Sequence, residues 1–143
     1  MKLPSIVPTF SLVSLSIGLL IASLTISSGL ALADVIDVET LKPKHYSKYK
    51  HRSIVTDKEG NRYRIQNSDT SKGLYISMTE KGKQTWKKHG AFYRYRDGKI
   101  IELKTYGFGL KEGLNEVYTD KGIVTRRYWF RTNLRNGPAE EFD

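Results

Sequence analysis

Apolar and polar residues alternate over short runs in the second half of the chain, and this pattern predicts β-strands. The run "HGAFYRYRDGKI" places Ala91, Tyr93 and Tyr95 at alternate positions, and "KEGLNEVYTDKGI" places Leu114 and Tyr118 four positions apart, with Glu116 between them on the same face. Side chains two positions apart on a strand share one face of a sheet. No stretch after residue 33 carries a helical apolar stripe over three turns. We therefore expect an all-β fold.

Turn signals separate these runs at short intervals and predict hairpins. They are Glu59-Gly60-Asn61, Lys81-Gly82, Asp97-Gly98, Lys121-Gly122 and Asn136-Gly137. Glycine adopts positive φ readily, as tight hairpin turns require. Short strands joined by such turns form an antiparallel meander. Residues 53–66, with a turn at Gly60, are expected to form a further hairpin.

A second set of glycines opens a repeated unit. Gly90, Gly113 and Gly137 lie 23 and 24 residues apart, and Gly73 precedes Gly90 by 17, so its unit is expected to have a truncated return strand. The fifth residue after each opening glycine is apolar or aromatic, and we expect these residues in one row on one face: Met78, Tyr95, Tyr118 and Phe142. Because a lone hairpin cannot bury a face, the units must stack edge to edge. The predicted fold is an open, elongated single-layer sheet of stacked β-hairpin repeats.

Residues 1–33 form an apolar, serine-rich leader in which Lys2 is the only charged residue. The leader closes on Ala31-Leu32-Ala33, a small-x-small pattern that signal peptidases accept. We interpret it as a signal peptide cleaved after Ala33, which predicts a periplasmic or extracellular protein. An uncleaved anchor is the alternative, because the uncharged run is long enough to span a bilayer. The chain has no cysteine, which excludes a lipid-modified amino terminus.

Residues 34–52 have no sustained period, are interrupted by Pro43 and are rich in Lys, His and Tyr, so we interpret them as a basic linker or arm. The repeat domain is expected to occupy residues 53–143. The chain has 24 Lys and Arg against 15 Asp and Glu, and because Lys2 belongs to the leader, residues 34–143 carry a formal charge of +8. This charge favours an anionic lipid surface, an acidic polymer or an acidic protein as partner, and nucleic acid is not expected outside the cytoplasm. The alternative is that the charge only keeps the protein soluble.

Two full units and a half unit follow a common order of glycine, Tyr-containing strand, glycine turn and return strand: "HGAFYRYRDGKIIELKTY", "EGLNEVYTDKGIVTRRYWF" and "NGPAEEF". This pattern, over residues 73–142, resembles the MORN family in its bacterial YwqK-type, antitoxin-like variant. The chain departs from it where Glu116 and Glu140 replace the aromatic residue that Tyr93 supplies. The resemblance implies an open β ribbon that contacts proteins and sometimes phospholipid, and it does not imply an enzyme.

No arrangement typical of catalysis or of a metal site is found, and we predict neither a cofactor nor a metal. His45 and His51 are wrongly spaced for a metal pair, and His89 is expected at a turn. Asp97 and Asp120 occupy positions where aspartate favours a turn.

Basic and aromatic residues interleave along the repeats, and strands about 4.8 Å apart bring such residues together. The predicted partner-binding surface consists of Tyr93, Arg94, Tyr95, Arg127 and Trp129. The alternative is that these cations only cover the sheet and protect its edges from aggregation. We expect an exported, non-enzymatic binding module for a protein or an anionic envelope surface. The alternative is an antitoxin or immunity-like protein that caps a toxin by strand addition.

Overall fold

The computed structural model describes residues 34–143, in which nearly all regular structure is β-strand. The leader predicted at residues 1–33 lies outside the described residues. The elements are β1 (Val35–Ile36), the 3-10 helix η1 (Pro43–Lys48), β2 (Ile54–Asp57), β3 (Arg62–Asn67), β4 (Ser71–Glu80), β5 (Lys83–Arg96), β6 (Lys99–Gly107), β7 (Leu110–Tyr118), β8 (Val124–Arg131), β9 (Leu134–Arg135) and β10 (Glu140–Glu141). Within residues 34–143, no helix has the length and apolar character needed to cross a membrane.

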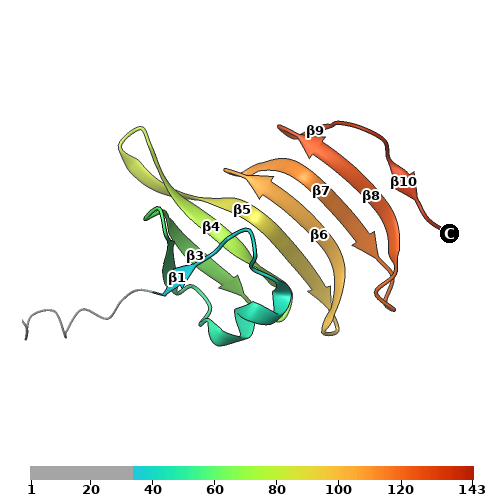
Figure 1. The fold of residues 1–143 in the computed structure, drawn as a ribbon, viewed down its shortest axis with the longest axis horizontal. Coiled ribbons are helices and arrows are strands. Elements are labelled where there is room, and N and C mark those ends of the chain that lie inside the picture. Colours follow the sequence, from blue (N-terminus) through green and yellow to red (C-terminus); the bar gives the residue numbers. More distant parts are fainter. Residues whose placement is uncertain (1–33) are drawn as a thin grey trace, which may run out of the picture. The chain divides into compact units, whose positions relative to one another are not determined.

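The strands form one open sheet in which β2 to β8 follow each other in sequence order, each antiparallel to the next (Figure 1). At one margin β1 pairs with β2 in parallel, and at the other β8 pairs with both β9 and β10. The prediction of an all-β, open antiparallel meander is confirmed. The hairpin expected at residues 53–66 is also present, as β2 and β3.

Turns join paired strands at four of the five positions that the sequence indicates. The fifth, Asn136–Gly137, connects β9 to β10, which pair with β8 and not with each other, and the hairpin turns at Phe108–Gly109 and Thr132–Asn133 carry no such signal. Lys81–Gly82 and Asp97–Gly98 both have two residues with positive φ, at 49° and 74° in each pair. This is the backbone of the type I′ turn, whose twist matches that of the flanking strands. The register on either side, Glu80 opposite Lys83 and Arg96 opposite Lys99, follows from these two-residue loops.

The first repeat unit, which Gly73 opens, differs from the prediction. Because successive strands run in opposite directions, the turn at Gly82 lies at the opposite end of the sheet from the turns at Gly98 and Gly122. The truncated return strand predicted for the Gly73 unit is therefore wrong. The 14-residue strand β5 is both the return from Gly82 and the first strand of the Gly90 unit.

The register also corrects the expected row of four large side chains. Met78, Tyr95, Tyr118 and Phe142 share one face of the sheet, as expected. Met78, however, lies opposite Thr85 near the Gly82 turn, at the far end of the sheet from the other three. The four residues thus share a face but do not form a single row.

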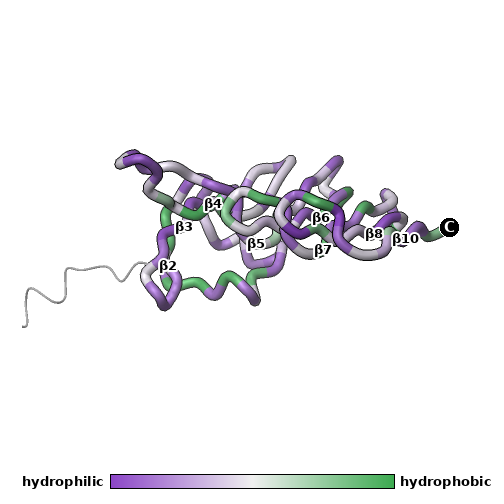
Figure 2. Tube along the Cα trace, turned by 90° about the horizontal axis from the view of Figure 1, so that it is seen from above, coloured by the Kyte–Doolittle hydropathy of each residue, from purple (hydrophilic) through white to green (hydrophobic). Residues whose placement is uncertain are grey.

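Residues 34–52 are part of the fold, contrary to the predicted linker or arm. This segment covers one face of β2–β4, as Figure 2 shows from the edge of the sheet. Its buried residues join the strand residues in one cluster: Ile36, Tyr46, Tyr49, Val55, Tyr63, Ile65, Leu74 and Ile76. The Asn67 amide fastens it by donating to the carbonyl oxygens of Tyr46 and Tyr49, at 2.9 and 2.8 Å. We call this side of the sheet the core face and the opposite side the open face.

Candidate functional site

The open face carries cations stacked on aromatic rings. The Arg64 guanidinium carbon lies 5.1 Å from the ring centroid of Tyr75 and 5.0 Å from that of Trp86. The Lys88 ammonium lies 4.7 Å from the Phe92 ring and 5.2 Å from the Tyr106 ring. Cations at these distances are attracted by the negative faces of the rings. We call these residues the cation–aromatic ladder: Arg64, Tyr75, Trp86, Lys88, Phe92 and Tyr106.

Strand register brings the ladder together from β3, β4, β5 and β6. Arg64 lies opposite Tyr75, and Tyr75 lies opposite Lys88, so all three side chains leave the sheet on the same side. The Phe92 ring meets Tyr75 and Tyr106 edge to face, with centroid distances of 5.5 and 6.1 Å. Edge-to-face contacts add to burial and fix the rings relative to one another. The ladder residues therefore form one set of contacts that crosses four strands.

A hollow of about 210 Å³ lies in the ladder beside Lys88. Its wall includes Arg94 and Lys104, whose side chains both pair with Glu102, at 3.0 and 2.8 Å. Three cations thus surround one carboxylate, which leaves an excess of positive charge. Burial lowers the pKa of Lys88, nearby Lys104 lowers it further, and Glu102 opposes both.

Lys88 has no carboxylate within ion-pair distance among residues 34–143. The ring faces are its closest compensation, and Glu102 acts on it only from beyond ion-pair distance. An anion brought to this hollow would meet a partly desolvated cation. The geometry therefore suits recognition of a negatively charged group.

The five residues predicted as the binding surface do not share a face. Strand register places Tyr93, Tyr95, Arg127 and Trp129 on the core face, and Arg94 alone on the open face. The prediction took neighbours such as Tyr93 and Arg94 together, but adjacent strand residues point to opposite sides. The ladder residues Arg64, Tyr75, Trp86 and Phe92 were not among the predicted ones.

Arg127 belongs to a polar network on the core face. Buried Glu116 accepts hydrogen bonds from the Tyr118 hydroxyl at 2.5 Å and from Arg127 Nε at 2.8 Å. A second nitrogen of Arg127 pairs with Glu140 at 3.2 Å. Burial raises the pKa of Tyr118, and its hydrogen bond to Glu116 raises it further. With both carboxylates engaged, Arg127 serves to join β7, β8 and β10.

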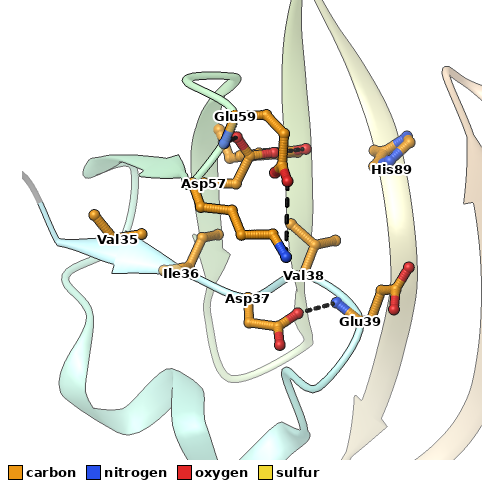
Figure 3. A pocket seen from close by; sticks show the side chains of 10 residues that line it. Val35, Ile36, Asp37, Val38, Glu39, Asp57, Glu59 and His89 are labelled. Carbon is orange, nitrogen blue, oxygen red and sulfur yellow. Dashed lines mark hydrogen bonds and ion pairs between the residues drawn. The ribbon is translucent and has the colours of Figure 1, made fainter.

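A cavity of about 490 Å³ lies between the segment after β1 and the sheet (Figure 3). Asp37, Glu39, Asp57 and Glu59 contribute carboxylates to its lining. Asp57 accepts hydrogen bonds from the Asn61 side chain and the Tyr63 hydroxyl, at 2.8 and 2.9 Å, and from two backbone amides of its own turn. Burial alone would raise the pKa of Asp57, but these hydrogen bonds outweigh burial and lower it. This carboxylate therefore holds the β2–β3 turn.

The three histidines have structural partners. His89 lies within β5 rather than at the predicted turn, and its Nδ1 accepts a hydrogen bond from the Phe108 amide at 3.2 Å. His45 and His51 each accept from a backbone amide in the same way, those of Lys42 and Asn67. In the part of the chain that the structure describes, no group of three or more potential ligands is placed to hold a metal ion.

Comparison with known proteins returns no match: no family model, no curated protein and no solved structure is significantly similar to this chain. The resemblance to the MORN family accordingly stays a prediction based on the repeat pattern.

Proposed function

We propose that this chain is a non-enzymatic β-repeat binding module, exported by its leader, whose open face docks a negatively charged partner. The partner is an acidic protein surface or an anionic envelope surface. The observation that carries the proposal is the position of Lys88, which is partly desolvated among aromatic rings without a carboxylate of its own. The chain's excess of basic residues adds long-range attraction to such a partner.

The ladder supplies what a docking surface needs beyond charge. Trp, Tyr and Arg are the residues that contribute most to binding energy at protein interfaces, and the ladder contains all three types. Its rings are already ordered by mutual contact, so little side-chain freedom is lost on binding. The core face lacks this availability over β2–β4, because residues 34–52 cover it there.

The test compares two variants with the same loss of charge. The first, R64Q/K88Q/K104Q, neutralises three cations of the open face. The second, K58Q/K81Q/K121Q, neutralises three exposed lysines in or beside turns. Each is titrated with phosphatidylglycerol-containing vesicles and, separately, with poly-glutamate as a model of an acidic protein surface. Thermal melting of both variants confirms that they are folded.

We expect the open-face variant to lose about 3 kcal/mol of vesicle binding, roughly a hundredfold, since each cation near an anionic surface contributes about 1 kcal/mol. The turn variant should lose much less, and binding should weaken steeply with salt. Preference for vesicles over poly-glutamate identifies an envelope surface as the partner, and the reverse identifies a protein. Equal losses in the two variants would mean that only net charge matters, and the proposal would fail.

A further inference from the structure

The outer edge of β8 is occupied by two very short strands. β9 pairs with Phe130 and Arg131 at one end of this edge, and β10 pairs with Arg126 and Arg127 toward the other end (Figure 1). β10 contains only two residues, and the exposed segment 136–139 leads to it. An edge strand presents a row of backbone donors and acceptors that can pair with any extended chain. The occupant of this edge is thus held by a limited set of contacts.

Side chains on both faces recognise β10. Glu140 pairs with Arg127 on the core face at 3.2 Å, and Glu141 pairs with Arg126 on the open face at 2.9 Å. Two consecutive acidic residues therefore meet two consecutive arginines, one pair on each side of the sheet. Phe142 completes the contact, because its ring lies 5.4 Å from the Arg127 guanidinium carbon. Its amide also donates to the Thr125 carbonyl oxygen at 2.9 Å.

These contacts are specific in pattern but individually weak. Arg126 and Glu141 are 56% and 72% exposed, and ion pairs with that exposure contribute little in water. The side chains of Arg127 and Glu140 are 33% and 40% exposed. A partner strand of the same chemistry would recover every one of these contacts, and a longer one would add backbone hydrogen bonds further along β8.

We propose that the β8 edge at residues 124–127 is a strand-acceptor site, which β10 occupies within the same chain. Its ligand is an extended segment of a partner protein with two consecutive acidic residues followed by an aromatic residue, and this segment replaces β10. The site is an edge of the sheet and does not include the cation–aromatic ladder. It stands or falls independently of the proposed function of the open face.

The test uses the whole protein and a fluorescent peptide with the sequence of residues 136–143, NGPAEEFD, in an anisotropy titration. In the variant E140K/E141K the protein's own β10 is repelled by Arg126 and Arg127, which frees the edge. We expect the peptide to bind this variant at least tenfold more tightly than the unchanged protein, in which β10 competes. Circular dichroism checks that the variant keeps its sheet.

Two control peptides separate strand pairing from attraction between opposite charges. A peptide of the same composition in scrambled order should bind at least tenfold more weakly. A peptide N-methylated at the phenylalanine lacks the N–H that donates to the Thr125 carbonyl oxygen, and it should also lose affinity. Equal binding of the three peptides, or no gain in E140K/E141K, would overturn the proposal. A dimer of E140K/E141K that excludes the peptide would also overturn it, because another copy's strand would then fill the edge.

Discussion

The Phe92 ring lies directly over Gly73 on the neighbouring strand. A Cβ at Gly73 would stand 2.5 Å from Cε2 of the ring and 2.7 Å from Cγ, well inside contact distance. Because Gly73 has no side chain, the Phe92 ring of β5 packs flat against the backbone of β4 and is buried there. Lys88 stacks on this ring, so the position of the ammonium group depends on a glycine one strand away.

Replacing Gly73 by Ala should therefore displace Phe92. We expect Gly73→Ala to lower the free energy of unfolding by about 1–3 kcal/mol, as for overpacking in a filled core. Gly107→Ala is the matched control, because its Cβ would meet only Glu112 at an ordinary 3.5 Å. Urea unfolding of both variants measures the difference. Equal midpoints would show that Phe92 moves aside without loss.

Tyr46 tests whether residues 34–52 belong to the folding unit. Tyr46 packs against the core face and is only 1% exposed. Tyr46→Ala should cost about 3–5 kcal/mol, the range for truncating a buried aromatic residue. Lys44→Ala, in the same 3-10 helix but exposed, should change stability by less than about 0.5 kcal/mol. If melting is the same for the two variants, this segment contributes nothing to the fold.

Tyr118 combines packing with a hydrogen bond to a buried carboxylate, and two substitutions separate the contributions. Tyr118→Ala should lower the free energy of unfolding by about 2–4 kcal/mol, as for truncation of a large packed side chain. Tyr118→Phe keeps the ring but removes the donor to Glu116, so it should cost about 1.5–3 kcal/mol. Chemical denaturation measures both. No change in either variant would contradict the structural role of the network around Glu116.

Stability should fall on acidification because of His89. Burial lowers the pKa of His89 below 6.5, although Asp57 opposes the shift, and its Nδ1 must be unprotonated to accept from Phe108. The unfolded chain then binds this proton more readily than the folded one. Stability due to the neutral imidazole is therefore present above pH 6.5 and decreases as the pH falls from there toward the folded-state pKa.

The measurement is the urea midpoint between pH 8 and pH 5. His89→Gln keeps a hydrogen-bonding group at this position but cannot titrate, so its midpoint should depend less on pH. His45 and His51 are present in both proteins, and the difference between the two profiles isolates His89. Superimposable profiles would show that His89 does not link stability to pH.

Local chemistry explains which parts of the fold are readable from sequence. Asp97–Gly98 is a strong hairpin signal, because Asp-Gly is one of the pairs that most readily adopt two positive φ angles in succession. The turn at Phe108–Gly109 gives no such sign, since phenylalanine rarely adopts its φ of 48°. There the amide hydrogen bond to His89, 19 residues away in sequence, supports the turn. A contact of that kind cannot be inferred from neighbouring residues.

The candidate site was harder to predict because it depends on register. Alternation within β5 places Arg94 on the opposite face from Tyr93 and Tyr95, so proximity in sequence does not bring these three side chains together. Placing Arg64 against Tyr75 and Lys88 requires the alignment of three strands, including the irregular connection at residues 68–70. A one-residue change in that alignment would move Arg64 to the other face.

The hydrophobic cluster is confined to strands β1 to β4 and to Tyr46 and Tyr49, in and directly after η1, with Val38, Leu41 and Met78 packed against it. Strands β6 to β10 are stabilised instead by backbone hydrogen bonds between paired strands, by ion pairs and by half-buried aromatic rings. Amide hydrogen exchange should accordingly be slowest in β3 and β4 and become progressively faster toward β10. Strands β1 to β4 are then the most stable part of the protein, and the margin at β8 to β10 opens locally without unfolding the rest of the sheet.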